Sequence, residues 1–381
     1  MPRISTHKPK VLVAMSGGVD SSAAAAMLVR EGYDVVGMTM RVASGEGREA
    51  SDKACCTLDA ANDARRVAGR LDIPHYVVNY IQRFEREVID DFTSEYLAGR
   101  TPNPCSRCNQ RVKFGALFEK AVAVGADYIA TGHYVRKVER GGRVGLQRAV
   151  HRAKDQSYTL AGLEQEQLRR ALYPLGELTK DDTRALAREL DLVTADKPES
   201  QEICFVPDDN YRNFLLSRVG PGRPGPIVNG RGEVLGEHKG LMNYTIGQRK
   251  GLGIAAPEPL YVLRIDVANN ALVVGYADET FCGGLTAGDV VWGAQTPAEA
   301  PFPCTVQIRY NHAPVPAMCE PRNGRVVVRF DQPERSVTPG QWAVLYDADE
   351  VVLAAALIDA SLPHNAAEAK SQGQPAPTAA S

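Results

Sequence analysis

The sequence has no apolar run that approaches the ~20 residues needed to cross a bilayer. Residues 1–10 are polar and basic and lack the apolar stretch and cleavage site of a signal peptide. Eight cysteines among 381 residues are too sparse for a disulfide scaffold, so we expect a cytoplasmic protein whose thiols are catalytic, metal-binding or buried. A charge excess is missing too, because 44 Lys and Arg stand against 46 Asp and Glu, for a net charge of -2. This excludes a generic polyanion binder, and any nucleic-acid surface must gather its basic residues on one face.

The remaining composition is ordinary for a folded chain. Hydrophobic residues make up 44% and charged residues 24%, which excludes wholesale disorder. At roughly 150 residues per domain, a chain of 381 residues is expected to form two or three domains. Such a chain buries an ample core without disulfide bonds.

The N-terminal half alternates between strand-like and helix-like segments. Short apolar runs predict strands, and stretches that space Ala, Leu and Val among charged residues predict helices. The alternation is typical of an α/β fold, in which helices cover a parallel sheet and ligands bind at the carboxyl ends of the strands. We expect strands at 11–15, 33–40, 75–80 and 128–130, and helices that end near 30 and span 58–71, 84–98 and 112–124.

The pattern changes after about residue 205. Glycine and proline are dense between 220 and 240, which predicts turns or an irregular connector. Short β-type runs follow, with a hairpin signal at 267–271, and they predict a small β-barrel or sandwich over the last part of the chain. The expected parts are an α/β catalytic domain at 10–208, a connector domain at 209–280, a β-barrel at 281–362 and a disordered tail at 363–381.

The first motif with chemistry is the string Ser-Gly-Gly-Val-Asp-Ser-Ser at 16–22, between a predicted strand and a predicted helix. Glycines let successive amides converge on an anion, and the helix start adds its unpaired amides and dipole. Asp20 can cap the helix or help to hold Mg²⁺. The segment lacks the signatures of P-loop NTPases and of dinucleotide folds. It predicts a pyrophosphate site, with a plain helix cap after a glycine turn as the alternative.

The second motif is a pair of cysteines, Cys105 and Cys108, in the proline-containing segment 101–114. Two prolines are expected to hold the segment extended, so that both thiols lie on a rigid loop entering a helix. Nearby Arg107 and Arg111 are expected to lower the pKa of these thiols. A third thiol, Cys204, stands in the segment 198–206. A Cys-x-x-Cys pair alone fits a zinc half-site, a redox pair or chance, but no second such pair completes a zinc site.

The string at 16–21 resembles the signature of the PP-loop ATPases, which cleave ATP between the α- and β-phosphates and transfer the adenylate to a carbonyl-type oxygen. Further strings follow in a fixed order, and together they resemble the family of bacterial tRNA-specific 2-thiouridylases over about residues 10–360. They are Pro-Cys-x-x-Cys-Asn at 104–109, Thr-Gly-His-Tyr at 131–134, Lys-Asp-Gln-Ser-Tyr at 154–158, Ile-Cys-Phe at 203–205, the Gly-rich run at 240–253 and Thr-Pro-Gly-Gln at 338–341. The implied architecture is a PP-loop domain that binds ATP, a small connector domain at 209–280 that binds tRNA, and a C-terminal β-barrel.

The resemblance implies ATP-dependent 2-thiolation of the wobble uridine (U34) in the tRNAs for Lys, Glu and Gln. ATP would adenylate the C2 carbonyl oxygen, which turns a poor leaving group into AMP. Cys204 would carry a persulfide received from an upstream sulfur-carrier protein. Cys108 would be the nucleophile that releases the sulfur, and the reaction would end in a Cys108–Cys204 disulfide that a reductant clears.

The resemblance also implies which residues bind the substrates. We further expect a monomer in the free state, with no membrane partner. ATP with Mg²⁺ would contact Ala14, Met15, Ser16, Gly17, Gly18, Val19, Asp20, Ser21, Met40 and Gly132, although Met40 equally fits a plain buried residue at a strand end. The target base would contact Asn103, Pro104 and Cys105, and the rest of the tRNA would contact His133, Lys154, Asp155, Gln156, Arg309, Tyr310 and Gln341.

One position departs from the family pattern, because members often have an aspartate where Cys105 stands. A thiol is a poorer acid or base than a carboxylate, which leaves that catalytic role open. Cys105, Cys108 and Cys204 are alternatively three ligands of a [4Fe–4S] cluster, or Cys105 is a spectator. Two other functions stay open: a PP-loop synthetase that acts on a small molecule, and a tRNA-binding protein with a vestigial nucleotide site.

Overall fold

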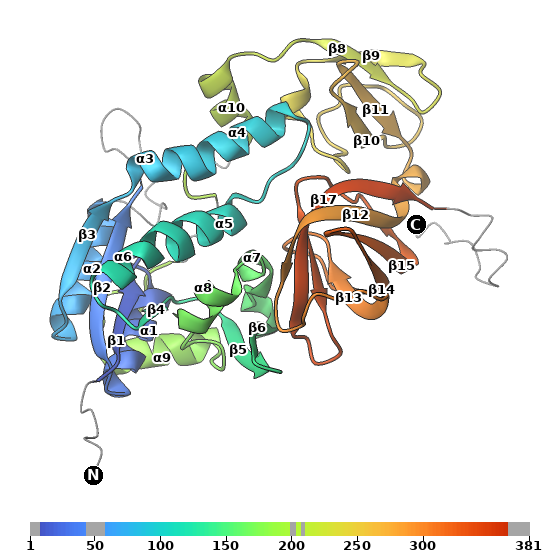
Figure 1. The fold of residues 1–381 in the computed structure, drawn as a ribbon. Helices are drawn as coiled ribbons and strands as arrows, with labels where there is room; N and C mark the ends of the chain where they lie inside the picture. Colours follow the sequence, from blue (N-terminus) through green and yellow to red (C-terminus); the bar gives the residue numbers. More distant parts are fainter. Residues whose placement is uncertain (1–7, 43–57, 199–202, 207–209, 365–381) are drawn as a thin grey trace.

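The computed structural model describes residues 8–42, 58–198, 203–206 and 210–364. Of the tail expected at 363–381, Pro363 ends the last strand, and residues 365–381 lie outside the described residues. Figure 1 shows an α/β body at the N-terminal side, a small sheet above and a barrel beside it. Among the helices of the described segments, none has the length and apolar character needed to cross a membrane.

The α/β body is built on a five-stranded parallel sheet of order β3-β2-β1-β4-β7. Its central strand is apolar on both faces: Leu12 packs into one hydrophobic core, while Val11 and Val13 pack into another. A strand buried on both faces reads as a continuous apolar run, which is why it stood out in the sequence. The strands are β1 (Lys10–Ala14), β2 (Asp34–Arg41), β3 (His75–Asn79), β4 (Tyr128–Ala130) and β7 (Ala171–Leu172).

Helices cover both faces of this sheet, so the predicted fold class is confirmed. One side carries α1 (Val19–Arg30), α2 (Leu58–Arg70) and α9 (Lys180–Glu189). The other side carries two long helices with π-helical segments inside them. The first consists of α3 (Ile81–Phe84), the π-helical Glu85–Ile89 and α4 (Asp90–Leu97), and the second of α5 (Pro104–Arg107), the π-helical Cys108–Ala116 and α6 (Leu117–Ala123).

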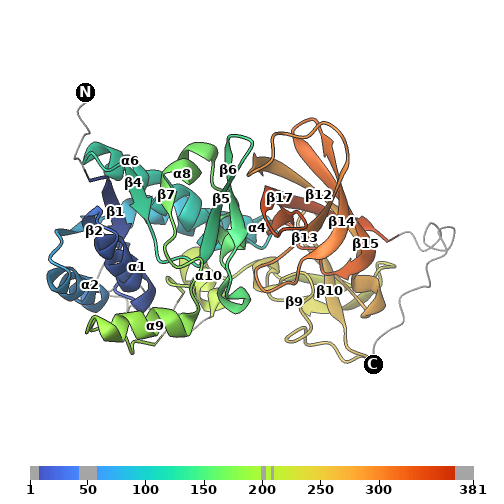
Figure 2. The ribbon, with the colours of Figure 1, turned by 90° about the horizontal axis from the view of Figure 1, so that it is seen from below.

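A hairpin that sequence patterns did not predict leaves the sheet after β4. Its strands β5 (Val135–Arg140) and β6 (Arg143–Arg148) lie between the α/β body and the barrel, as Figure 2 shows. Arg140 pairs with both Asp347 and Asp349 of the barrel, at 2.5 and 2.8 Å. Charged residues stand throughout the hairpin because it bridges two bodies and does not fill one core. It is followed by the 3₁₀ turn Arg152–Lys154, α7 (Ser157–Leu160) and α8 (Gln165–Arg170).

The middle part is a four-stranded sheet of order β10-β11-β8-β9, preceded by α10 (Tyr211–Val219). The segment 220–240, expected to be an irregular connector, holds two of its strands. That expectation is wrong because β8 contributes a buried Ile227 to the core and pairs on both sides, despite its proline. The predicted hairpin is confirmed, with Asn270 at φ 49° in its turn. The strands are β8 (Gly225–Val228), β9 (Val234–His238), β10 (Tyr261–Asp266) and β11 (Ala271–Gly275), with a 3₁₀ turn at Leu241–Asn243.

The C-terminal part is a closed six-stranded barrel of order β12-β15-β14-β13-β16-β17, which decides between the predicted barrel and sandwich. Closure leaves no unpaired strand edge. Its core is filled by small and β-branched side chains from every strand. A 3₁₀ turn, Asp278–Thr280, precedes β12 (Phe281–Trp292), β13 (Phe302–Gln307), β14 (Val315–Arg322), β15 (Arg325–Arg335), β16 (Trp342–Tyr346) and β17 (Val352–Pro363).

The central position of β1 leads to a prediction about stability. Leu12 has no exposed surface, so Leu12→Ala leaves a cavity and is expected to cost about 2–5 kcal/mol of unfolding free energy. Leu97→Ala, on a side chain that is half exposed, is the matched control and should change stability by less than about 0.5 kcal/mol. Urea denaturation followed by circular dichroism measures both. Equal losses would contradict a core centred on β1.

Candidate active site

The loop between β1 and α1 is held by its own serines. Ser21 Oγ accepts a hydrogen bond from the Ser16 amide at 3.1 Å and donates to the Gly18 carbonyl at 3.2 Å. Ser22 Oγ donates to the same carbonyl at 2.8 Å. Gly17 has φ +70°, and a side chain there would overlap the Ala60 carbonyl of α2. The loop is therefore a fixed backbone shape at the carboxyl end of the sheet and not merely a flexible turn.

The other residues expected to contact ATP lie around this loop. Met40 is on β2, and the amide of Met15 donates to the carbonyl of Met38 on that strand at 2.8 Å. Gly132, just after β4, packs against the first turn of α1, where an added Cβ would lie 2.6 Å from the Ser21 amide nitrogen. The structure thus brings the predicted nucleotide residues to one edge of the sheet, and their contact with ATP stays a prediction.

Asp20 has a different role from the helix cap that the sequence suggested. Gly18 occupies the cap position, and the Asp20 carboxylate accepts from Lys180 Nζ at 2.7 and 2.9 Å. The Tyr134 hydroxyl donates to the same carboxylate at 2.8 Å. The side chain of Lys180 is only 9% exposed, whereas that of Asp20 is 33% exposed, so the ammonium is buried and the carboxylate is partly open to solvent.

The side chain of a second lysine, Lys197, contacts the loop from a distant segment of the chain. Its ammonium donates to the Gly17 carbonyl at 2.9 Å and to Asp63 on α2 at 2.6 Å. Sequence patterns singled out neither this lysine nor Lys180, because both come from segments far along the chain. The only available signal was that Lys197 immediately precedes the segment that contains Cys204.

The nucleotide edge has no preformed cage for Mg²⁺ among the described residues. Over the ranges that the structure describes, no three His, Cys, Asp or Glu side chains gather in a way that suits a metal ion. Both Asp20 oxygens already accept from Lys180. Mg²⁺ commonly keeps its waters and binds through the phosphates of a nucleotide, so this edge fits Mg²⁺ delivered with ATP better than a preformed protein cage.

The cysteine pair lies within a helix, which corrects the expected extended loop. Pro104 is the first helical residue, where its missing N–H is not needed, and Asn103 caps the helix by accepting from the Ser106 amide at 3.1 Å. Cys105 is exposed on α5, and Cys108 is half-buried where the π-helical segment begins. Because the helix starts earlier than expected, both thiols have fixed directions.

The arginines near these thiols are engaged in ion pairs. Arg107 pairs with Asp91 at 3.3 Å, and Arg111 pairs with Glu87 at 3.4 Å. Burial raises the pKa of Asp91, and the charge of Arg107 opposes that rise. The carboxylates therefore share the positive charge that was expected to stabilise a thiolate, and a lowered pKa at Cys108 stays a prediction.

Cys204 and Cys108 come from distant segments but pack against the same hydrophobic core. Cys204 is half-buried and precedes Phe205, whose ring lies 5.3 Å from the rings of both Phe92 and Phe214. These aromatic contacts fix the residue that follows Cys204. Cys105 and the other two thiols do not form a cluster of metal-ligating side chains in the described part of the chain, so the structure gives the [4Fe–4S] alternative no support.

The barrel reaches the thiol-bearing helix through Gln341. Gln341 Nε2 donates to the Thr101 carbonyl at 2.8 Å, and the Tyr158 hydroxyl donates to Gln341 Oε1 at 3.3 Å. Tyr310, on the same side of the barrel, is 42% exposed, and its pKa is raised by burial and by the charges of Cys105 and Asp155. Exposed Arg309 adjoins it. The structure therefore brings residues expected to bind tRNA from the barrel close to Cys105.

Three residues expected to touch tRNA use their side chains inside the protein instead. The Asp155 side chain is 5% exposed and accepts from the Ala149 amide and from Ser157 Oγ at 2.8 and 2.7 Å. His133 is buried, with Nδ1 2.7 Å from Thr131 Oγ1. Gln156 Oε1 accepts from the backbone amide of the residue after His133 at 3.0 Å. Lys154 is half-buried, and its contact with tRNA stays a prediction.

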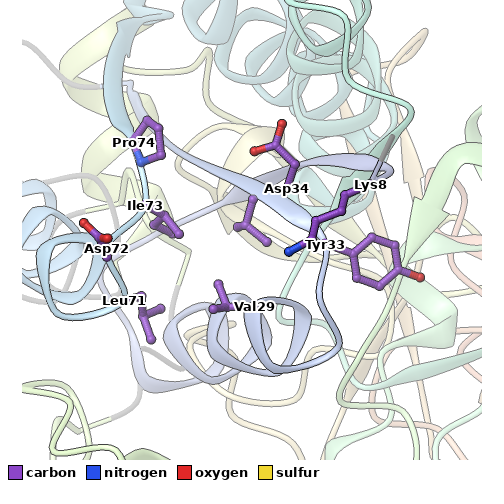
Figure 3. A pocket seen from close by; sticks show the side chains of 9 residues that line it. Lys8, Val29, Tyr33, Asp34, Leu71, Asp72, Ile73 and Pro74 are labelled. Carbon is purple, nitrogen blue, oxygen red and sulfur yellow. The ribbon is translucent and has the colours of Figure 1, made fainter. Parts of the chain in front are cut away.

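A hollow in the described structure lies elsewhere. It measures about 580 Å³ and lies at the amino ends of the strands, between the end of α1 and the turn that joins α2 to β3 (Figure 3). None of the residues expected to bind ATP or tRNA lines it. Its lining consists of Lys8, Val29, Tyr33, Asp34, Val35, Leu71, Asp72, Ile73 and Pro74.

Known families account for nearly the whole chain. Family models match residues 9–208 (tRNA methyl transferase HUP domain), 212–276 (tRNA methyl transferase PRC-barrel domain) and 282–358 (Aminomethyltransferase beta-barrel domain). A relative from Carboxydothermus hydrogenoformans named tRNA-specific 2-thiouridylase MnmA is 53% identical over 354 residues, which cover 91% of this chain and 96% of the relative. A protein of the same name from Geobacter metallireducens is 50% identical over 365 residues, covering 93% and 98%.

The chain belongs to the tRNA-specific 2-thiouridylase family. This confirms the resemblance carried by the ordered sequence motifs. It also removes the support for a small-molecule synthetase, because the identity extends through the connector and the barrel of the 2-thiouridylases and not only through the nucleotide loop.

Buried His133 leads to a prediction about pH. Burial lowers its pKa well below 6.5, so the folded protein holds a neutral ring, whereas the unfolded chain takes up the proton near pH 6.5. The stability this provides is present above about pH 6.5 and is lost as the pH falls, by up to about 1.4 kcal/mol per pH unit. Urea denaturation between pH 7.5 and 5.5 should show a steeper loss for the natural protein than for His133→Gln. Parallel curves would contradict a neutral buried ring.

Proposed function

We propose that this chain thiolates C2 of the wobble uridine (U34) in the tRNAs for Lys, Glu and Gln, with ATP activating the base and a cysteine persulfide supplying the sulfur. The observation that carries the proposal is the packing of Cys108 and Cys204 on one core of the domain that also holds the nucleotide loop. Two thiols from separate segments within one ATP-binding domain suit a two-stage reaction of activation and sulfur transfer.

In the activation stage, the uridine O2 attacks the α-phosphorus of ATP. The bond from this phosphorus to the oxygen that bridges to the β-phosphorus breaks, and pyrophosphate leaves. The amides of the loop and of the α1 start would stabilise the negative charge that grows on the leaving group. Mg²⁺ bound to the phosphates supplies further charge neutralisation.

In the transfer stage, the terminal sulfur of a Cys204 persulfide attacks C2, and the C2–O bond to AMP breaks. The base is then linked through two sulfurs to Cys204. The Cys108 thiolate attacks the Cys204 Sγ, which breaks the S–S bond, forms a Cys108–Cys204 disulfide and leaves the new sulfur on the base. An external thiol must reduce this disulfide, and an upstream carrier must reload Cys204.

The tRNA is proposed to lie across the junction of the catalytic domain and the barrel. Cys105 and Tyr310 are exposed there, whereas the neighbouring Asn103 uses its side chain as a helix cap. Cys105 is then a contact of the target base and not an acid or base, because its thiol is exposed on the first turn of the helix that carries Cys108. Buried His133, the enclosed carboxylate of Asp155 and half-buried Gln156 support this surface from within.

The two thiols yield a separation-of-function prediction. Cys108→Ser or Cys204→Ser should lower 2-thiouridine formation by on the order of 10³-fold, because a hydroxyl neither carries a persulfide sulfur nor opens a disulfide. Release of pyrophosphate that depends on tRNA should continue, since neither thiol takes part in adenylation. The assay uses ATP, Mg²⁺, unmodified tRNA and a persulfide donor, with iron-free protein.

The matched control is Cys282→Ser, a half-buried thiol at the start of the barrel, which should keep full activity. Thiolation by Cys108→Ser at the natural rate would overturn the persulfide scheme. Absence of tRNA-dependent pyrophosphate release from the natural protein would instead overturn the activation stage.

Tyr310 leads to a prediction about tRNA affinity. A stacked aromatic ring contributes about 1–3 kcal/mol per base, so Tyr310→Ala should weaken tRNA binding by roughly 5- to 100-fold and leave ATP binding unchanged. Tyr76→Ala is the control, because Tyr76 is 57% exposed and lies on β3, an edge strand of the parallel sheet. Filter binding at two salt concentrations measures both. Equal effects would show that the barrel face is not part of the tRNA surface.

A further inference from the structure

Lys197 has a position that the proposed mechanism does not use. Its ammonium bridges two parts of the nucleotide edge: the Gly17 carbonyl of the loop, at 2.9 Å, and Asp63 of α2, at 2.6 Å. The two side chains stay 34% and 23% exposed, so solvent and a ligand can reach the pair. By contrast, Lys180 is 9% exposed and gives its charge to Asp20 beneath the loop.

The backbone at Lys197 is held in place by hydrogen bonds. Arg184 of α9 donates to the carbonyl oxygens of Ala195 and Lys197, at 2.6 and 3.1 Å. The backbone amide of Lys197 donates to the carbonyl of Thr194 at 3.2 Å. These hydrogen bonds fix the backbone at Lys197 without a ligand. The flexible side chain therefore extends from a defined position.

The nucleotide loop needs a cation from outside its own sequence. Residues 16–18 carry no positive charge, and the first charged side chain of α1 is Asp20. A polyphosphate that binds to these amides brings several negative charges, which grow on the pyrophosphate as it leaves. Lysine has three N–H donors, and the two bonds to Gly17 and Asp63 use two of them.

We propose that Lys197 is a nucleotide-binding residue whose ammonium contacts the β- or γ-phosphate of ATP and stabilises the departing pyrophosphate. This rests on the proposed use of ATP by this loop. A phosphate oxygen takes the third N–H or replaces the Gly17 carbonyl, and Asp63 keeps the ammonium in place when the nucleotide is absent. The alternative role is structural, as a clamp that joins α2 to the loop.

The two roles differ in what Asp63 does. A clamp needs both partners, so Asp63→Asn should harm ATP binding as much as Lys197→Met. A phosphate ligand needs only the ammonium, and removing the carboxylate that competes for it should leave ATP affinity equal or higher. The substitution at Asp63 therefore separates the two roles even if the lysine variant is less stable.

The experiment measures ATP and AMP binding to the full chain by isothermal titration with Mg²⁺ present. Since hydrogen bonds to charged groups are among the stronger ones, Lys197→Met is expected to weaken ATP binding by about 10- to 100-fold and AMP binding by less than about 3-fold. Lys197→Arg should recover part of the loss. Lys10→Met is the control, because Lys10 pairs with Asp34 at the amino end of β1, away from the loop.

Unchanged ATP affinity in Lys197→Met, or equal losses in Lys197→Met and Asp63→Asn, would overturn the inference. An equal loss for AMP and ATP would do so as well, since AMP has neither of the proposed phosphates. Failure of the natural protein to bind ATP would instead overturn the proposed function, so the two failures are distinguishable.

Discussion

The close approach of three backbone segments at the carboxyl end of β1 is the constraint on which the rest of this structure depends. The loop at Gly17 lies against α2, and the segment at Gly132 lies against the first turn of α1, with no room for a side chain at either contact. These contacts are possible because β1 is apolar on both faces and is covered by helices on both sides. The amides that start α1 are consequently held open at the sheet edge, with the thiol-bearing helix on the other layer of the same domain.

The catalytic domain and the barrel are joined by a buried polar chain that reaches the surface proposed for tRNA. Ser157 Oγ lies 2.7 Å from Asp155 and 3.0 Å from the Tyr346 hydroxyl, which donates to Gln307 at 3.1 Å. Gln307 Nε2 in turn donates to the Tyr310 carbonyl at 2.7 Å. Because buried polar groups are costly unless they are paired, this chain fixes the relative position of the two bodies more strictly than apolar packing alone. Asp155 is therefore connected through this chain to the backbone of Tyr310.

The parts that sequence patterns predicted are those set by local chemistry. The buried strand β1, the Ser-Gly-Gly turn and the Asn270 hairpin each follow from residues that are adjacent in the chain. The ordered motifs also predicted the family. The sequence prediction starts the thiol-bearing helix too late, because it expects the prolines to hold this segment extended. Pro104 instead occupies the first helical position, which suits proline. Sequence patterns could not predict the position of Lys197, because its partner Asp63 is more than a hundred residues away. They could not predict the enclosure of Asp155 either, because that depends on the barrel packing against this segment.

The pairing of charges explains how a chain with a net charge of -2 can serve two polyanionic substrates. Around the site, Lys180, Lys197, Arg107 and Arg148 each pair with an aspartate of the same domain. Where the lysine itself is buried, as in Lys180 (9% exposed) paired with Asp20 (33% exposed), breaking the pair carries a large desolvation cost for the ammonium, so the pair remains structural. Where the lysine is itself partly exposed, as Lys197 is in its pair with Asp63, moving the ammonium from the carboxylate to a phosphate costs little free energy, because both partners are oxyanions. Affinity for phosphates then depends on how exposed the cation of each pair is. The overall charge of the protein is therefore a poor guide to its substrates.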